Sequence, residues 1–373
     1  MIYADHAATT KISETAKLAM LSAMEKDWYN PSSLYTPGQQ ASGTLRIAHC
    51  LGCLPKEIYF TSGGSEADNQ AILSAAAIGK RQGKMHIIST AFEHHAVLHT
   101  LKKLEKEGFE ITLLDVGEKG IVSPVQVEKA IRPDTILVTV MYANNEIGTI
   151  QPIREIGAIC RKNGVLFHTD AVQAAGHLQI NVEKDQIDML SLSAHKFNGP
   201  KGIGVLYAKT GVFLTNLIEG GGQERGKRAG TENLPAIVGM VAALEEACSL
   251  QKERSIYVTK LRDQLIDGLK KIPGALLNGD ATNRLPGNVN FCFPDTEAEG
   301  LLLLLDNKGI CASSGSACTS GFLDPSHVLL AIGRDPQTAR GSLRLTLDYE
   351  NTPEEVETII EAVTDTVRIL RGC

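Results

Sequence analysis

Four short stretches of the chain place polar or reactive side chains next to glycine or small residues. The first, residues 61–69, reads TSGGSEADN and lies between a strand pattern and a helix pattern. Its glycines let the backbone approach a ligand closely, and the free N–H groups at the start of a helix attract an anion. Ser65 adds a hydroxyl donor. A phosphate site is one interpretation of this stretch, and an ordinary helix N-cap at Ser65 is the other.

The second stretch begins at Asp170, which ends an apolar strand pattern and precedes Gln173. Ligands of open α/β sheets bind at the carboxyl ends of the strands, so both side chains would face a site. A carboxylate buried there needs a partner, because an unpaired buried charge is costly. The alternative is that Asp170 caps the helix that follows.

Lys196 follows the next buried strand, together with Ser193 and His195. Desolvation and neighbouring cations lower the pKa of such a lysine and make it a candidate to form a Schiff base. A lone lysine would more simply be solvated. The strand-terminal aspartate and the upstream anion site favour the reactive interpretation here, and together they suggest pyridoxal phosphate as the cofactor.

The fourth stretch, residues 311–321, reads CASSGSACTSG. Small and polar residues surround Cys318, so burial in a core is a weak explanation for it. An exposed thiol on a mobile segment is suited to reach into a site and out again. Most of the eight cysteines instead lie in apolar stretches, as Cys160 and Cys292 do, and we expect these to be buried as small hydrophobic residues.

Other motifs are weaker. Residues 221–227 match the G-x-x-x-x-G-K pattern of a P-loop, but Arg228 replaces the Ser or Thr that would bind Mg²⁺. The C-x-x-C at residues 50–53 lacks a second ligand pair, and His95 and His99 share a helix face with apolar neighbours. We therefore expect neither a nucleotide-binding P-loop nor a metal site.

The elements that must position these residues alternate along the chain. β-Branched apolar runs alternate with amphipathic helix patterns, which is typical of βα units on a largely parallel sheet. A long helix pattern over 234–268 could join two domains, a large α/β domain to about residue 255 and a smaller α+β domain after it. We predict strands at 58–61, 86–89, 111–114, 135–140, 165–168, 187–192, 203–207, 287–293 and 341–347, and further helices at 66–80, 96–107, 153–162 and 353–371.

Composition narrows the class of protein. The 373 residues carry a net charge of −6, with 43% hydrophobic and 21% charged residues, which argues against disorder. A nucleic-acid-binding protein would need a basic face, so direct nucleic-acid contact is not expected. The apolar run 301–305 is far shorter than a membrane span, and the first residues resemble no secretory signal. We expect a cytoplasmic protein with no membrane partner.

Taken in order, the motifs resemble those of the cysteine desulfurases, fold-type I enzymes of the class V aminotransferase family. The resemblance is closest to members with a longer loop around the catalytic cysteine, and it runs nearly end to end. It is carried by residues 5–10 (DHAATT), 30–33 (NPSS), 62–69 (SGGSEADN), 93–94 (EH), 144–148 (NNEIG), 170–173 (DAVQ), 193–196 (SAHK), 228–231 (RAGT) and 313–318 (SSGSAC).

The resemblance implies three parts and a set of cofactor contacts. Residues 1–15 would pack with the small domain, 16–255 would form the large domain that binds pyridoxal 5′-phosphate, and 256–373 would form the small domain with the cysteine loop. Lys196 would hold the cofactor covalently, Asp170 would pair with its ring nitrogen, His94 would stack on the ring and Gln173 would donate to its phenolic oxygen. Phosphate contacts would come from Gly64, Ser65, Ser193, His195 and, across a homodimer interface, Thr231.

The implied reaction converts L-cysteine to L-alanine. Asn145 and Arg344 would bind the substrate carboxylate, the latter in a bidentate contact. Lys196 would move protons with help from His94. Cys318 would attack the substrate sulfur, become a persulfide and pass the sulfur to an acceptor protein. Its thiol is mostly protonated at neutral pH when free, so the site must help to ionise it.

Three departures from the family pattern concern the phosphate site, residue 6 and the end of the sequence. Gly64 and Ser65 stand where an Ala-Thr pair is common, which keeps the hydroxyl, and His6 stands where Asn or Tyr is frequent. The sequence ends at Cys373 without the long tail that serves scaffold docking, so both iron–sulfur cluster assembly and tRNA thiolation remain open as destinations.

Two other functions compete with this prediction. A selenocysteine lyase or another class V enzyme would share Lys196 and Asp170, but neither chemistry requires a nucleophilic thiol at position 318. A non-catalytic sulfur-carrier scaffold could keep the fold, but it would have no need of the intact lysine, aspartate and cysteine. Such a scaffold would be colourless, whereas the enzyme would absorb visible light.

Overall fold

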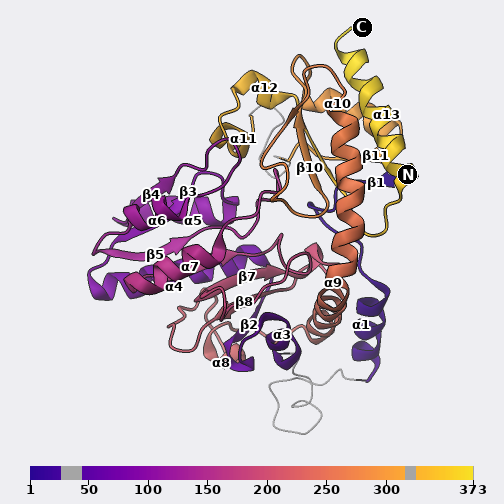
Figure 1. Cartoon of the computed structure of the whole chain (residues 1–373). Coiled ribbons are helices and arrows are strands. Elements are labelled where there is room, and N and C mark those ends of the chain that lie inside the picture. Colours follow the sequence, from indigo (N-terminus) through magenta and orange to yellow (C-terminus); the bar gives the residue numbers. More distant parts are fainter. Residues whose placement is uncertain (27–43, 316–324, 373) are drawn as a thin grey trace.

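The computed structural model describes residues 1–26, 44–315 and 325–372 (Figure 1). Its central feature is a seven-stranded sheet in the order β2-β8-β7-β6-β5-β3-β4. Only β8 runs antiparallel to its neighbours, so the mostly parallel α/β fold that the sequence predicts is confirmed. The strands are β2 (Ile58–Thr61), β3 (His86–Thr90), β4 (Glu110–Leu114), β5 (Thr135–Thr139), β6 (Leu166–Asp170), β7 (Met189–Ser193) and β8 (Gly204–Ala208).

Helices cover both faces of this sheet, which explains why its inner strands are apolar along their whole length. On one face, α4 (Gly64–Gln82) and α5 (His95–Lys106) pack on alternate strand residues such as Ile87 and Leu137. On the other, α6 (Pro124–Ala130), α7 (Ile153–Asn163) and α3 (Thr44–Leu51) cover the intervening residues, among them Ile88 and Val138. The 3₁₀ turn η1 (Pro55–Glu57) connects α3 to β2.

A second hydrophobic core lies toward the C-terminus. The antiparallel sheet β12-β10-β9 packs with α10 (Ala298–Asn307) and α13 (Pro353–Leu370). The strands are β9 (Leu276–Leu277), β10 (Asn288–Cys292) and β12 (Ser342–Thr346). The first residues of the chain join this part, because β1 (Ile2–Tyr3) pairs in parallel with β11 (Ile310–Cys311) (Figure 1). Two short helices, α11 (His327–Ala331) and α12 (Pro336–Arg340), precede β12.

One long helix connects the two cores. α9 (Leu234–Leu269) has 36 residues, which corresponds to a length of about 54 Å. Its first half packs with the large sheet and its second half with the C-terminal core, while α1 (Glu14–Lys26) lies along it (Figure 1). By length and composition α9 could cross a membrane, but 56% of its most apolar window is buried within the protein. Its hydropathy is therefore that of a core helix.

The structure corrects two expectations. The helices α1, α3, α6 and α10 were not among those predicted from the sequence. The expected burial of cysteines is right for Cys160 and Cys292 but wrong for Cys248, which is exposed. The other described cysteines are Cys50, Cys53 and Cys311, and they are partly buried.

Candidate active site

Asp170 is held firmly at the carboxyl end of β6, between β5 and β7. Its side chain is buried, and the Val172 N–H donates to its Oδ1 at 2.9 Å. Its own carbonyl accepts the Tyr142 N–H at 2.8 Å. The carboxylate therefore keeps one orientation, as a group that must face a ligand at a strand end should. The predicted N-cap role is also partly visible, because the Asp170 side chain closes the turn that follows the strand.

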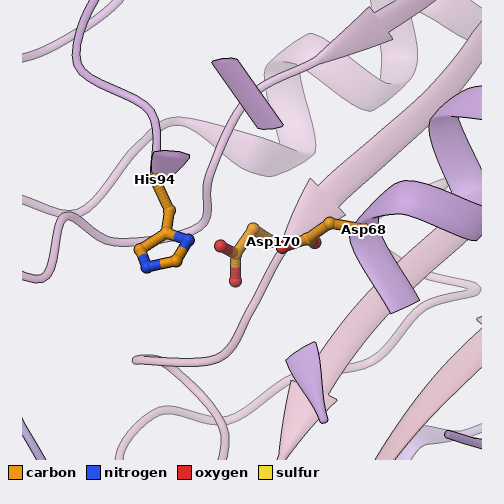
Figure 2. Close-up of side chains that lie close together, drawn as sticks. All are labelled: Asp68, His94 and Asp170. Atoms are coloured by element: carbon orange, nitrogen blue, oxygen red, sulfur yellow. The ribbon is translucent and has the colours of Figure 1, made fainter. Parts of the chain in front are cut away.

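A second carboxylate and a histidine lie beside Asp170. Ligand atoms of Asp68, His94 and Asp170 all lie within 4.8 Å of one another, and Figure 2 shows the His94 ring and the Asp170 carboxylate facing each other. Asp68 comes from the first turns of α4, and His94 is the N-cap of α5, where its Nδ1 accepts the Ala96 N–H at 3.1 Å. Three separate elements thus meet at one point.

The electrostatics of this cluster favour a cationic ligand. Burial raises the pKa of Asp170, and burial together with the Asp170 charge raises the pKa of Asp68 well above its ordinary value. His168 lies 3.6 Å from Asp68, but burial lowers the pKa of that histidine to about 3, so it is neutral. Among the described residues, Asp68 Oδ1 has no hydrogen-bond partner. Two buried carboxylates of this kind gain most from a positive charge placed between them.

Lys196 lies in the 3₁₀ turn η2 (Ala194–Lys196), directly after β7. Its Nζ donates to the carbonyl oxygens of Ala7 and Ala8 at 2.6 and 2.8 Å, and Gln173 Nε2 donates to the same Ala7 oxygen at 3.0 Å. The Lys196 charge also acts on Asp170, where it lowers the carboxyl pKa, although burial is the larger influence. The structure therefore brings Lys196, Gln173 and Asp170 to one region, as predicted.

The predicted phosphate site lies at the start of α4. A Cβ on Gly64 would come within 2.5 Å of Val172 Cγ2, so only glycine lets this helix start approach the Asp170 turn so closely. Ser193 is buried against the same glycine, whereas Ser65 is exposed in the first helical turn. Burial and nearby lysines lower the pKa of His195 to about 4, so its ring is neutral at pH 7. Backbone N–H groups and neutral donors of this kind suit a phosphate.

The 228–231 segment is attached to the same helix start. Arg228 Nε lies 3.0 Å from Glu66 Oε1, and the Ser62 N–H donates to the other Glu66 oxygen at 2.8 Å. Thr231 is exposed and lines a pocket together with Ser62 and Arg228. Thr231 therefore lies beside the predicted phosphate site.

The predicted substrate-binding residues Asn145 and Arg344 contact each other where the segment after β5 meets β12. Arg344 is almost fully buried, with Nη1 3.1 Å from the Asn145 carbonyl oxygen and Nη2 2.8 Å from Asp5 Oδ1. Its Nε has no hydrogen-bond partner among the described residues. The guanidinium is thus already paired with a carboxylate of the chain itself, which a substrate carboxylate would have to displace.

Cys318 and residues 30–33 lie outside the described residues, so their predicted roles stay predictions. The neighbouring residues on each side of the cysteine segment are described. Ser313 forms a backbone pair with Arg344, donating at 3.2 Å and accepting at 2.6 Å. On the other side, His327 Nε2 lies 3.0 Å from the carbonyl oxygen of Glu93, the residue before His94. Both ends of the segment therefore meet elements of the site.

The structure also adds residues that the sequence prediction missed. Asp68 lies only three positions after Ser65, close to one helical turn, and that spacing within the 61–69 motif was the available signal. Asp5 stands in the 5–10 motif, but nothing local shows that it pairs with Arg344. His95 and His99 have ring centroids 5.1 Å apart, yet the only candidate metal cluster within the described ranges is the one at Asp170.

These residues fit pyridoxal phosphate. The buried carboxylates of Asp170 and Asp68 suit a protonated ring nitrogen, and Lys196 is close enough to lower the pKa of Asp170. The glycine-rich start of α4 offers N–H donors for a phosphate. Comparison with known proteins agrees: residues 2–359 match the family model for class V aminotransferases, and the chain belongs to that family. Enzymes of this family and the cysteine desulfurases within it use pyridoxal phosphate.

Within the family, the similarity is to cysteine desulfurases. The chain is 51% identical to cysteine desulfurase IscS of Methanosarcina thermophila, covering 100% of this chain and 93% of that protein. It is 46% identical to the putative cysteine desulfurase IscS 1 of Bacillus subtilis, with 99% of each covered. A solved NifS-like protein matches with a TM-score of 0.92 at 36% identity, with 99% of each chain covered. The predicted resemblance is confirmed by these matches.

A further solved structure bears on the ligand. A protein described as SspA in complex with cysteine matches with a TM-score of 0.82 at 36% identity, covering 94% of this chain and 100% of that one. Cysteine is therefore a ligand of a protein with the same fold and more than one third of its residues in common.

Proposed function

We propose that this chain is a pyridoxal-phosphate-dependent cysteine desulfurase. It removes sulfur from L-cysteine, releases L-alanine and carries the sulfur as a persulfide on Cys318 to an acceptor. The observation that carries the proposal is the meeting of Asp170, Lys196 and the α4 start at the strand ends, together with the contact between Arg344 and Asn145. Full-length similarity to curated cysteine desulfurases supports the same substrate.

Residues at one end of the large sheet would hold the cofactor. Asp170 would pair with its ring nitrogen, His94 would lie against its ring, and Gln173 would donate to its phenolic oxygen. When bound, pyridoxal phosphate supplies an electron sink that weakens the bonds around the substrate α-carbon. Gly64, Ser65, Ser193 and His195 would bind its phosphate, together with Thr231 of a second copy in a homodimer.

Lys196 would link the cofactor to the chain and would then move protons. In the structure its Nζ donates to the Ala7 and Ala8 carbonyls at 2.6 and 2.8 Å. An amine released from these carbonyls, and desolvated beside the cofactor, becomes a base that can take a proton from substrate. His94 lies beside Asp170 and would assist that transfer.

Arg344 selects the substrate carboxylate. Its guanidinium would exchange the Asp5 carboxylate at 2.8 Å for that of L-cysteine. Asn145, whose backbone carbonyl accepts from Arg344 Nη1 at 3.1 Å, would add its side-chain amide. The exchange preserves the charge balance of a buried arginine throughout binding. A planar guanidinium also fixes the orientation of the bound amino acid, which directs its side chain consistently.

The sulfur step balances without an external oxidant. The Cys318 thiol attacks the substrate sulfur, the carbon–sulfur bond breaks, and a sulfur–sulfur bond forms. The former β-carbon takes a proton and leaves as the methyl group of L-alanine. Overall, L-cysteine and one enzyme thiol become L-alanine and one enzyme persulfide. The persulfide sulfur then passes to an acceptor protein of iron–sulfur cluster assembly or of tRNA thiolation.

Replacement of the nucleophile tests this proposal. Cys318→Ala should abolish persulfide and sulfide formation from L-cysteine, while the purified protein keeps its yellow cofactor. Borohydride reduction followed by peptide mapping should find the cofactor on Lys196 in both proteins. A Cys318→Ala variant that releases sulfide at the full rate would contradict the assigned nucleophile. An unmodified Lys196 in active enzyme would contradict the whole assignment.

The acceptor and the cellular setting belong to the same proposal. We expect a cytoplasmic homodimer, in which Thr231→Ala weakens cofactor retention without changing the subunit fold. Adding a candidate iron–sulfur scaffold or tRNA-thiolation protein should raise the rate of alanine release, because it clears the persulfide from Cys318. An acceptor that leaves this rate unchanged and takes up no sulfur is not the partner.

A further inference from the structure

Glu146 is a buried carboxylate next to the substrate-binding residue Asn145. Its side chain is 3% exposed, and burial raises its pKa. Its Oε2 accepts a hydrogen bond of 2.5 Å from the Ser326 hydroxyl. The same hydroxyl caps α11, accepting the N–H groups of Val328 and Leu329 at 3.1 and 3.4 Å. Glu146 thereby orients the residue at which α11 begins.

Gly315 contacts the same carboxylate from the other side of the cysteine segment. A Cβ at this glycine would lie 2.9 Å from Glu146 Oε2, and its φ of +93° favours glycine. The Gly315 N–H also donates to Ser313 Oγ at 3.1 Å, and Ser313 pairs with the Arg344 backbone. Residues on both sides of the segment 316–324 therefore meet at one side chain.

Glu146 is itself fixed by the walls of the site. Its N–H donates to Asn144 Oδ1 at 2.8 Å, and its carbonyl accepts Asn290 Nδ2 at 3.2 Å. Asn290 is the β10 partner of Arg344. The Asn144 amide reaches back to the Phe92 carbonyl at 3.0 Å, close to His94. Hydrogen bonds thus connect Glu146 both to the segment before His94 and to the strand that pairs with Arg344.

We propose that Glu146 is a positioning residue for sulfur transfer, fixing the separation of Gly315 and Ser326 and so the two ends of the segment that carries Cys318. The inference deepens the proposed function and rests on it, because the consequence for catalysis requires a nucleophile in that segment. Glu146 does not contact the reacting atoms. Its effect on rate comes from placement alone, and a misplacement of about 1 Å can reduce a rate by about 10²-fold.

The test uses the full-length holoenzyme and matched variants. Glu146→Ala removes the anchor, and Glu146→Gln keeps an acceptor oxygen for Ser326. Ser326→Ala removes the hydroxyl, whereas Ser326→Thr retains it. Glu57→Gln is the control, because Glu57 is another buried carboxylate, which accepts the Leu54 N–H and both Thr210 donors at 2.7–2.9 Å away from the site.

Hydrogen exchange and steady-state kinetics are then measured together. Glu146→Ala should raise exchange in peptides covering 313–315 and 325–329 and lower kcat for alanine by about 10²-fold, with visible absorbance and KM within twofold of wild type. Ser326→Ala should show a smaller loss, and Glu146→Gln, Ser326→Thr and Glu57→Gln should stay within about threefold of wild type.

Two results would overturn the inference. One is unchanged exchange at both ends in Glu146→Ala together with unchanged persulfide formation. The other is an equal loss in Glu57→Gln, which would indicate a general effect of losing a buried carboxylate. If the wild-type holoenzyme forms no alanine, the proposed function fails instead. The exchange measurement would still decide whether Glu146 fixes the two ends.

Discussion

The cofactor side and the substrate side of the site treat buried charge in opposite ways. Asp170, at the end of β6, and Asp68, in the first turns of α4, are buried together. Their pKa values are raised, although Lys196 lies close to Asp170. At β12, Arg344 is equally buried but has Asp5 as a partner at 2.8 Å. The two aspartates would gain a positive partner when a ligand binds. Arg344 would instead exchange the carboxylate of Asp5 for that of the ligand.

The difference has consequences for affinity. Burying an unbalanced charge costs several kcal/mol. A cationic ring nitrogen at Asp170 would offset this desolvation penalty. A substrate carboxylate at Arg344 gains less, because it replaces an existing ion pair. The arrangement favours a cofactor that is retained and a substrate that is bound reversibly. The experiments below test each side separately.

The largest effect is expected at Asp170. Asp170→Asn removes the negative partner of the ring nitrogen, and loss of a buried ion-pair partner costs about 3–5 kcal/mol. We expect kcat/KM for alanine formation to fall by about 10²–10⁴-fold. Asp68→Asn is the matched control and should lose less than tenfold. A greater loss in Asp68→Asn would mean that the ring nitrogen pairs with the other carboxylate.

A pH-dependent stability effect is expected at Glu93. This residue is buried, accepts hydrogen bonds from Thr90 and the Met141 N–H, and has a pKa raised by burial to about 8. The folded state keeps the proton that the unfolded chain loses above its ordinary pKa, so stability falls as pH rises toward about 8. Glu93→Gln cannot titrate and lacks this fall.

Thermal unfolding of the holoenzyme measures the effect. Between about pH 5 and about pH 8, the Tm of Glu93→Gln should rise relative to that of wild type. The change corresponds to about 3 kcal/mol in the free energy of unfolding. Above about pH 8 the difference should remain constant. A difference that does not change over this range would show that Glu93 is ionised throughout in the folded protein.

On the substrate side, Arg344→Lys should mainly raise KM. A lysine keeps the charge but loses the planar bidentate contact, so we expect KM for L-cysteine to rise about 30-fold, with kcat within a few-fold of wild type. Initial rates of alanine release measure both constants. A fall in kcat at constant KM would place Arg344 in the chemical step and not in carboxylate binding.

The smallest effect should come from Asp5. Asp5→Asn removes the internal competitor of the substrate while leaving a polar group of the same size near Arg344. We expect KM for L-cysteine to fall about twofold to fivefold at unchanged kcat, since each tenfold in affinity is about 1.4 kcal/mol. A rise in KM would show that Asp5 orients the guanidinium and does not compete with substrate.

Sequence reasoning predicted the parts of this molecule that depend on local pattern. The strands of the large sheet and the positions of Asp170 and Lys196 at their ends follow from apolar runs and from the geometry of parallel sheets. The close approach of the α4 start to the Asp170 turn follows from its glycines. The roles of individual residues were inferred from the family motifs taken together and not from any residue alone.

The partners of these residues could not be predicted in the same way. Asp5 and Arg344 are 339 positions apart, and Glu146 and Ser326 are 180 apart, so no periodicity relates them. Asp68 becomes a neighbour of Asp170 only when α4 packs across the sheet. Strands of two residues, such as β1 and β11, carry too little pattern to be detected.

The pairing of β1 with β11 places the first residues of the chain beside segments that are synthesised much later. The carbonyls that accept from Lys196 belong to Ala7 and Ala8, and the Ala7 N–H donates to Thr346 Oγ1 at 2.8 Å. The beginning of the chain therefore acquires its final neighbours only after the ribosome has translated β12. A product that ends before β12 lacks the Thr346 contact that positions Ala7, so the carbonyls beside Lys196 are not fixed in it.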